Sequence, residues 1–263
     1  MAIAPMVEAL GLEAPHPKLF FVGDDPSLGI YQKLFANRVC LLEEKDPTKN
    51  FSDTKTSAKV FNNMLEDNDH RPDEEKVLKA RLLDIVIGDF DRHFDQWRWG
   101  VDSTTKGKEV KGKIYYPIPR GRDAAFFNSD GLAIRLMSHR IPMISGFHHD
   151  IHRVDWLGYR AKDFDRIFMN SLGKTEWKRI ISEVQQQLTD SVIHYAVHQL
   201  PHEVDSITGN TLASKIISRR KQLGYEAMRY YRFVSRKVNI IGSNQREYFK
   251  VSQADSGLRV RVY

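Results

Sequence analysis

The sequence is poor in cysteine and in long apolar runs. Its 263 residues include one cysteine, Cys40, so the chain forms no internal disulfide and offers no cysteine-based metal site. The setting of Cys40, Arg38-Val-Cys-Leu-Leu42, predicts a buried strand position rather than a reactive thiol. The apolar runs are short: Leu82 to Ile87 is interrupted by Asp84, and none approaches the ~18 residues of a spanning helix. A membrane span is therefore excluded.

Repeats and a secretory leader are also missing. No internal repeat or low-complexity stretch is visible, which excludes solenoids and propellers. The first residues, Met-Ala-Ile-Ala-Pro-Met-Val-Glu, lack the charged and continuous apolar regions of a signal peptide. What is present is a hydrophobic content of 41% and an aromatic content of 11%, ample for a packed core. The chain is thus expected to be globular, with no disordered or coiled-coil character.

The charge balance is mildly basic and uneven. Forty Lys plus Arg stand against 34 Asp plus Glu, a net charge of +6. Much of the excess lies between Lys215 and Lys237, which predicts a surface that faces anions. Aromatic residues are interleaved there, but their spacing fits a helix core better than stacking on bases, and no nucleic-acid motif is present. A solvated helix face, or a surface toward anionic lipid or lipopolysaccharide, is favoured over nucleic acid.

The apolar patterns predict an α+β protein that is mainly helical in its carboxyl two-thirds. Alternating and short apolar runs predict strands, and apolar residues spaced by three and four predict helices. The helix that begins after Pro72 at Asp73-Glu74-Glu75 and runs into Gly88 has the strongest pattern. The remaining predicted strands are 18–22, 38–43, 96–101, 113–118, 248–251 and 258–263, the last four as two hairpins, and the remaining predicted helices are 54–66, 162–170, 174–198 and 211–236.

The stretch Gly88-Asp-Phe-Asp-Arg-His-Phe-Asp-Gln-Trp97 is unusually polar for its place between an apolar helix and a strand. Asp91 is followed by Gln96 five positions later and by Asp95 four positions later. Phosphoryl-transfer enzymes use this form, with an acid that accepts the hydroxyl proton and an oxygen ligand for magnesium five residues on. A loop that turns back beside its own helix brings two such side chains within a few ångströms of each other.

A second candidate loop follows the hairpin, in Pro117-Ile-Pro-Arg-Gly-Arg-Asp-Ala-Ala-Phe-Phe127. Asp123 is the candidate for a second metal-holding acid. The prolines restrict the incoming strand, Gly121 allows a tight bend, and the apolar residues after Asp123 would anchor it. Three arginines, Arg92, Arg120 and Arg122, could then neutralise phosphate charge.

These two loops resemble the catalytic and metal loops of atypical protein-kinase-like families: the spore-coat CotH kinases, the HipA-type toxin kinases, the secretory-pathway kinases and the lipid kinases. Most closely the chain resembles an uncharacterised bacterial family, frequent in Bacteroidetes, in which such a module lies between a metallophosphoesterase domain and an outer-membrane barrel. The resemblance extends over nearly the whole chain, including Pro17 to Pro26, Leu41 to Glu44, Arg219-Arg220 and Gly242 to Tyr263.

The resemblance implies a kinase-like carboxyl lobe with β-hairpins and a partial amino-terminal lobe. It divides the chain into 1–50 as partial lobe and hinge, 51–240 as carboxyl lobe, and 241–263 as a terminal β-hairpin or a junction to a further domain. It also implies a cell-envelope or periplasmic location, and upstream and downstream domains of a longer chain as partners. The cofactors implied are Mg²⁺ or Mn²⁺ and ATP, with an acceptor of unknown class.

Carried over residue by residue, the resemblance makes Asp91 the catalytic acid. Asp95 or Gln96 becomes the first metal ligand and Asp123 the second. Gln96 stands where the family usually has Asn, and Gly121 stands where relatives often have a second Asp. The nucleotide-clamping lysine is expected upstream of this chain; Lys18 and Lys33 are candidates without a recognisable motif. The predicted site therefore comprises catalytic Asp91, Arg92 and His93, nucleotide-binding Arg120 and Arg122, and metal-holding Asp95, Gln96 and Asp123.

Several alternatives stay open. His93 is expected to orient the loop by hydrogen bonds to backbone carbonyls rather than to act on phosphate. Trp97 and Trp99 are expected to face the core, with Arg98 outside. The histidines and the acid between His148 and His152 have the residue types of a metal site, and a metal-dependent hydrolase would need them to join the carboxylates. The competing class of function is an inactive kinase-like scaffold or binding module of the cell envelope.

Overall fold

A computed structural model describes residues 1–44, 50, 51, 53–102, 112–128, 131–138, 140–142, 145–254 and 257–263. The fold is α+β and mainly helical, with three small sheets, as the sequence predicts. The predicted hinge, the loop between the two central strands and the turn of the last hairpin lie largely outside the described residues. Among the helices described, none has the length and apolar character needed to cross a membrane.

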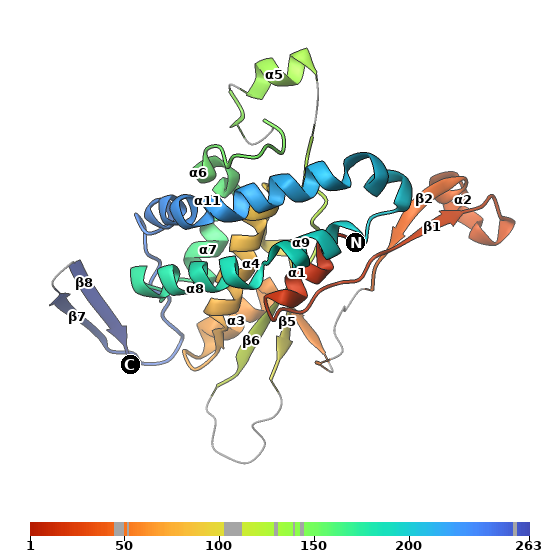
Figure 1. Cartoon of the computed structure of the whole chain (residues 1–263). Coiled ribbons are helices and arrows are strands. Elements are labelled where there is room, and N and C mark those ends of the chain that lie inside the picture. Colours follow the sequence, from red (N-terminus) through yellow and green to blue (C-terminus); the bar gives the residue numbers. More distant parts are fainter. Residues whose placement is uncertain are drawn as a thin grey trace.

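Helix α4 (Glu74–Ile87) lies at the centre of the helical part (Figure 1). Helices α8 (Lys174–Gln187) and α11 (Asn210–Val234) pack on it and on each other. Helices α1 (Ala4–Ala9) and α9 (Asp190–Val197) complete this layer. The shorter helical segments are η1 (Pro26–Tyr31), α2 (Gln32–Phe35), α5 (Leu132–Ser138), α6 (Val154–Leu157), η4 (Tyr159–Ala161), α7 (Lys162–Phe168), α10 (His202–Val204) and η5 (Asp205–Gly209).

The sequence predicts one helix over 174–198, but the structure has two. Helix α8 ends at Gln187, and α9 begins at Asp190. The Thr189 side chain accepts a hydrogen bond from the Val192 backbone amide at 3.2 Å and so caps the new helix. Apolar spacing continues across the break, which is why periodicity alone merges the two helices.

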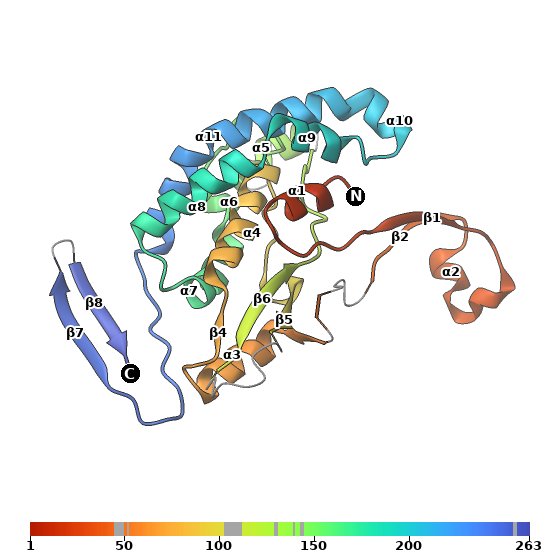
Figure 2. The same cartoon turned by 60° about the horizontal axis from the view of Figure 1, so that its bottom comes forward.

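A four-stranded mixed sheet lies below the helices in the order β3-β5-β6-β4 (Figure 2). Strands β5 (Trp97–Val101) and β6 (Ile114–Pro119) form the antiparallel hairpin that the sequence predicts. Strand β3 (Thr54–Thr56) pairs with β5, so the predicted helix over 54–66 starts later, as α3 (Ser57–Glu66). Strand β4 (Arg71–Pro72) pairs in parallel with β6 and leads directly into α4.

Strand β5 places the side chains of two tryptophans in the core. Trp97 and Trp99 are buried; Trp97 stacks on Phe164, and the Trp99 ring is tilted against the same Phe164 ring. The Arg98 Nε donates to Thr54 Oγ1 at 2.9 Å on the other face. The alternation predicted from the sequence is therefore confirmed. The Trp99 indole N–H donates to Ser57 Oγ at 2.9 Å, so the ring's polar atom is satisfied inside the core.

Two hairpins project from this body. Strands β1 (Lys18–Val22) and β2 (Arg38–Leu42) pair antiparallel at one end, and β7 (Phe249–Ala254) and β8 (Gly257–Val262) pair near the carboxyl terminus (Figures 1 and 2). Both pairs were predicted as strands. Cys40, however, is only half-buried, because β2 lies in the projecting hairpin and not in the core; the prediction of a buried position is wrong.

Candidate functional site

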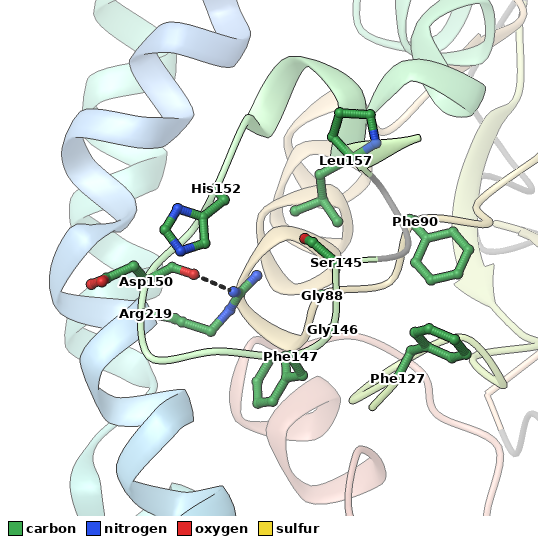
Figure 3. A pocket seen from close by; sticks show the side chains of 11 residues that line it. Gly88, Phe90, Phe127, Ser145, Gly146, Phe147, Asp150, His152, Leu157 and Arg219 are labelled. Atoms are coloured by element: carbon green, nitrogen blue, oxygen red, sulfur yellow. Dashed lines mark hydrogen bonds between the residues drawn. The ribbon is translucent and has the colours of Figure 1, made fainter. Parts of the chain in front are cut away.

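The polar loop after α4 starts from a sharply defined helix end. Gly88 has φ +73°, and it ends the helix in the left-handed conformation that glycine adopts without strain. A Cβ atom at Gly88 would lie 2.9 Å from Phe147 Cδ2, so the site also has no room for a side chain. Figure 3 shows Gly88, Phe147 and Arg219 together at this point. The loop that follows thus leaves the core at a fixed place.

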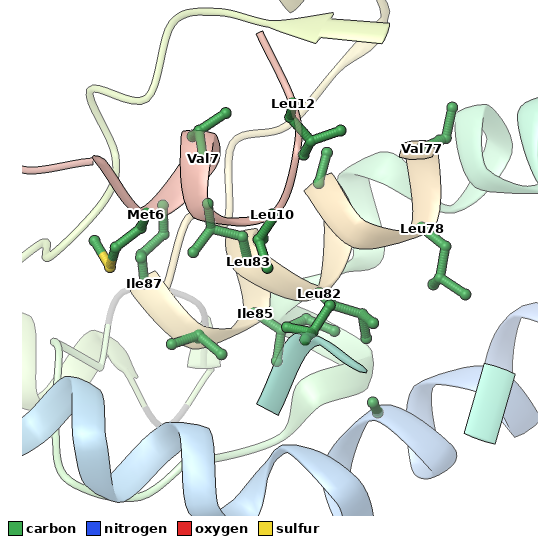
Figure 4. Close-up of a cluster of buried hydrophobic side chains, with 14 of the residues drawn as sticks. Met6, Val7, Leu10, Leu12, Val77, Leu78, Leu82, Leu83, Ile85 and Ile87 are labelled. Carbon is green, nitrogen blue, oxygen red and sulfur yellow. The ribbon is translucent and has the colours of Figure 1, made fainter. Parts of the chain in front are cut away.

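From Ala80 to Ile87 every residue of helix α4 is buried. The helix starts at the Asp73 cap, whose Oδ1 accepts from the Lys76 backbone amide at 3.0 Å. Apolar side chains of α1, Met6 and Val7 among them, and that of Leu10, which follows α1, belong to the same core as those of α4 (Figure 4). A helix enclosed in this way is a rigid base for the loop that it carries.

Arg92 is the residue that fixes the loop. Its side chain is 1% exposed, and it forms a two-pronged ion pair with Asp84 of α4: Nε to Oδ2 at 2.9 Å and Nη2 to Oδ1 at 3.0 Å. Nη2 also donates to Asp89 Oδ2 at 3.1 Å. Planar guanidinium and carboxylate groups in this arrangement give both energy and geometric specificity. The sequence predicts Arg92 as a phosphate-neutralising group, yet its guanidinium faces inward.

The same guanidinium joins the loop to the one after β6. The Arg92 Nη1 donates to the backbone carbonyl of Arg120, and it lies 3.4 Å from both the backbone and the side-chain oxygen of Gln96. A backbone hydrogen bond of 2.9 Å from the Arg120 amide to the Gln96 carbonyl reinforces this contact. The two loops that the sequence singles out are therefore neighbours in space.

Asp84 is surrounded by positive charge. Besides Arg92, it contacts Arg81 Nη1 at 2.7 Å and Arg122 Nε at 3.1 Å. Burial by itself would raise the pKa of this carboxyl, but the neighbouring guanidinium groups outweigh it and hold the pKa well below its usual value. Asp89 differs: burial and the Asp84 charge raise its pKa. Asp84 thus stays ionised as the centre of the network.

The two predicted nucleotide-binding arginines have partners already. The Arg122 side chain is 7% exposed and bound to Asp84, although its Nη2 is buried and has no hydrogen-bond partner among the described residues. The Arg120 Nε donates to Glu43 Oε1 at 2.9 Å, at the base of the β1–β2 hairpin. Arg120 is about a quarter exposed and so remains accessible from solvent.

The predicted catalytic acid lies at the edge of this network. The Asp91 backbone amide donates to Asp89 Oδ1 at 3.2 Å, and its carboxylate pairs with Arg160, which comes from η4. Arg160 is half-exposed and was not identified from the sequence. His93 is half-buried and its backbone carbonyl accepts from the Gln96 amide at 3.2 Å.

The predicted metal ligands do not form a ready-made cage. Asp95 and Asp123 are exposed, and Gln96 packs against Gly121, where a Cβ would lie 3.2 Å from Gln96 Cγ. In the described part of the chain no three or more histidine, cysteine or acidic side chains are grouped to hold a metal. Magnesium usually takes one or two protein carboxylates and completes its shell with water and substrate phosphates. Asp95, Gln96 and Asp123 offer the oxygen donors that such a site would use.

The histidine cluster lies in a loop beside this region. His148 and His152 come before α6 and have ring centroids 6.1 Å apart, and the His148 Nε2 lies 2.7 Å from the Ser145 carbonyl oxygen. Asp150 is held by Gln222, whose Nε2 lies 3.0 Å from its Oδ1. His152 and Asp150 line a pocket with Gly88 and Phe90 (Figure 3). The cluster does not join the carboxylates, as a hydrolase would require.

Part of the basic segment 215–237 is internal, which corrects its interpretation as one anion-facing surface. Arg219 is buried, and it donates to the carbonyls of Ile85 at 2.8 Å and Val86 at 2.7 Å, at the end of α4. Burial lowers the pKa of this guanidinium to about 10. Arg220 pairs with Asp190 at 2.7 Å and Arg229 with Glu226 at 3.1 Å. A cation at the carboxyl end of α4 also complements the helix dipole.

Sequence reasoning missed the charged core beneath the loops. Arg81 and Asp84 stand within the apolar pattern of α4, and a charge at a core position is the signal that could have identified them. Two of their partners, Arg92 and Arg122, lie in the loops that the sequence singles out. Asp165, which pairs with Arg81, and Arg160, which pairs with Asp91, come from distant elements and carry no local signal.

Comparisons with known proteins give a distant structural likeness. No protein-family model matches the chain, and no curated protein matches it. Among solved structures, the chain is similar to a proinflammatory kinase of Helicobacter pylori, CtkA, with 14% sequence identity and a TM-score of 0.48. The similarity covers 86% of this chain and 82% of that chain.

Proposed function

We propose that the chain is a kinase-like module that transfers a phosphoryl group from ATP to an acceptor hydroxyl with the help of Mg²⁺ or Mn²⁺. The observation that supports this function is the position of Arg92. One buried guanidinium holds Asp84, Asp89 and the backbone of both polar loops, which fixes the acid-bearing loop beside the second loop. Phosphoryl transfer depends mainly on such positioning and on electrostatic stabilisation.

In this proposal Asp91 accepts the proton of the acceptor hydroxyl while the acceptor oxygen bonds to the γ-phosphorus. The bond from phosphorus to the bridging oxygen breaks, and ADP leaves. Arg92 is a positioning residue, and His93 supports the loop backbone. Asp95, Gln96 and Asp123 would hold the metal, which when bound neutralises charge on the phosphates. Arg120, and Arg122 through its unpartnered Nη2, would contact the phosphate oxygens.

A specific contact favours a second candidate, an inactive scaffold or binding module. The Asp91 carboxylate is already paired with Arg160, which occupies the oxygen that would have to face the acceptor hydroxyl. The second loop also has glycine at position 121, beside Gln96, where the kinase-like families that the loop resembles often have an acid. A scaffold would keep the buried network and lose the metal.

Nucleotide binding separates the two candidates. We expect ATP with Mg²⁺ or Mn²⁺ to raise the thermal midpoint of the chain, because a ligand at 100 times its Kd stabilises the folded state by about 2.7 kcal/mol. Asp123→Asn should lose the metal-dependent part of the shift. Asp163→Asn, at another exposed aspartate, is the matched control and should retain it. Absence of any shift would reject the phosphotransferase and leave the scaffold.

Gly121→Asp gives a sharper test. Gly121 has φ +58°, a conformation that Asp tolerates better than most residues, and the new carboxylate would lie next to Gln96. We expect it to strengthen metal-dependent nucleotide binding by about tenfold, the effect of one added charge-assisted ligand. Asn has nearly the shape of Asp but no charge, so Gly121→Asn should not strengthen metal-dependent nucleotide binding. Equal binding in both variants would count against a metal site here.

Catalysis itself is measured as transfer of label from γ-labelled ATP, to the chain or to added acceptors. Asp91→Asn should abolish transfer while it leaves the nucleotide-induced thermal shift in place, since the proton acceptor is not needed for binding. Transfer that survives Asp91→Asn would assign the base elsewhere.

A further inference from the structure

Arg160 lies over the carboxylate of Asp91, the proposed proton acceptor. Its guanidinium forms an ion pair with Asp91 Oδ1. That oxygen is buried, yet it accepts no hydrogen bond from the part of the chain that the structure describes, so the ion pair lacks hydrogen-bond geometry. A carboxylate oxygen that has lost water without gaining a donor is unfavourable. The pair is therefore open to exchange with a better donor and a better acceptor.

The two partners differ in exposure. The Arg160 side chain is 52% exposed, and the Asp91 side chain is 28% exposed. The ion pair uses one terminal nitrogen of the guanidinium, Nη1, and the group has further N–H donors. About half of the Arg160 side chain thus stays in solvent, able to bind an anion that approaches Asp91.

The segment that carries Arg160 runs beside the loop of Asp91. His152 and Leu157, which precede Arg160, line a pocket together with Phe90, the residue before Asp91 (Figure 3). The cavity volume of this pocket is about 30 Å³, room for about two water molecules. The pocket is too small to enclose an acceptor. An extended peptide that lies on the exposed segment and presents a single hydroxyl fits this surface better.

A second exposed guanidinium lies on the same segment. The Arg153 guanidinium is 5.4 Å from the ring centroid of Trp156, and this ring stacks on Tyr159 with the centroids 5.6 Å apart. Tyr159 adjoins Arg160 in η4. Asp155 is on the segment too, but it is half-buried, whereas both arginines are exposed. Charge complementarity therefore favours a peptide with acidic side chains.

We propose that Arg160 selects the acceptor, an inference that rests on the proposed phosphoryl transfer. In the free chain Arg160 covers Asp91, and an acidic side chain next to the acceptor hydroxyl replaces Asp91 as its partner. The acceptor is thus a serine or threonine of a peptide with acidic neighbours. Asp91 Oδ1 then accepts the hydroxyl proton, the hydroxyl oxygen bonds to the γ-phosphorus, the bond from phosphorus to the bridging oxygen breaks, and ADP leaves.

Transfer of label from γ-labelled ATP with Mg²⁺ to synthetic peptides tests this inference. Each peptide has one central serine, and the residues beside it are either glutamate or glutamine. We expect kcat/KM to be at least about tenfold higher for the glutamate peptides, the effect of one hydrogen bond between charged groups.

Arg160→Gln removes the charge and keeps a polar side chain. It should abolish the preference for glutamate and raise the hydrolysis of ATP without peptide, because water then reaches Asp91 Oδ1. Arg160→Lys keeps the charge and should keep part of the preference. A merely structural role would instead lower transfer to both kinds of peptide alike. Arg179→Gln, at another half-exposed arginine held in an ion pair, is the matched control and should keep the full preference.

Transfer without a preference for glutamate, or a preference that survives Arg160→Gln, would overturn the inference and leave phosphoryl transfer standing. Hydrolysis of ATP with no label on any peptide would do the same, because the acceptor would then belong to another class. If ATP is neither hydrolysed nor transferred and gives no thermal shift, the proposed function itself fails, and the selection by Arg160 fails with it.

Discussion

Single side chains decide how the polar loops are held, and Arg92 is the main one. It was expected to face phosphate, and instead it is enclosed by Asp84, Asp89 and the backbone of Arg120. The difference follows from burial: a guanidinium with 1% exposure needs carboxylates and carbonyls around it.

Replacing Arg92 should be costly. Arg92→Met leaves Asp84 and Asp89 without their shared partner, and we expect a loss of about 3–5 kcal/mol in the free energy of unfolding. Arg160→Met removes a half-exposed partner of Asp91 and should cost less than about 1 kcal/mol. Urea unfolding of the two variants measures the difference. Similar losses in both would show that the buried network adds little stability.

Asp84 should account for part of the loss of folding stability at acidic pH. Its folded pKa lies well below the usual 3.8, so its ionised form stabilises the fold above about pH 4, and this contribution is lost as the pH falls toward 2. Asp84→Asn, itself less stable at neutral pH, should show a shallower acid limb, by up to about 1.4 kcal/mol per pH unit.

Urea unfolding between about pH 2 and 6 gives this slope, in the range where carboxylates titrate. Asp163→Asn, at an exposed aspartate, is the control and should keep the wild-type slope. An unchanged slope in Asp84→Asn would contradict the role of Asp84.

Element boundaries were predicted best where the signal is local. The start of α4 at Asp73 and its end at Gly88 are confirmed, because cap chemistry and glycine conformation act within one turn. The break at Thr189 was missed, because the apolar spacing of α8 and α9 runs on across it.

Gly88 and Gly11 allow the cost of a side chain at the end of a helix to be compared between a crowded and an open position. Both have positive φ, +73° and +71°, but only Gly88 has a neighbour within reach of a Cβ. Gly11→Ala should cost about 1 kcal/mol of backbone strain. Gly88→Ala should cost clearly more, since Phe147 must also move. Thermal unfolding measures both, and equal losses would show that Phe147 yields freely.

At the scale of the whole molecule, the buried carboxylate of Asp165 links helices α4, α7 and α11. Arg81 of α4 contacts Asp165 of α7 at 2.9 Å, and the Tyr230 hydroxyl of α11 contacts Asp165 and, at 3.0 Å, the Gly158 carbonyl. Burial raises the pKa of Asp165 against the effect of Arg81, so the carboxylate depends on these partners.

Tyr230→Phe should therefore destabilise the entire helical part. We expect a loss of about 1–3 kcal/mol, the cost of a buried acceptor without its donor, with an unchanged denaturant slope because the part unfolds as one unit. Tyr231→Phe, at the half-buried neighbouring ring, is the control and should lose much less. A changed slope in Tyr230→Phe would indicate that the helices unfold separately.

The sequence by itself determined the α+β class, the ends of α4, the strands β1 and β2, the β5–β6 and β7–β8 hairpins, and the two loops that carry the candidate site; it missed β3, β4 and the pairing of β1 with β2. The features that it determined depend on residues close together in the chain, where periodicity, caps and turn residues act. The tertiary structure alone decided the rest: which guanidinium meets Asp84, that Arg160 reaches Asp91, that Arg219 closes α4, and that the Cys40 strand stands outside the core. Such contacts join elements far apart in sequence, so their partners follow from packing and burial and leave no local pattern to read.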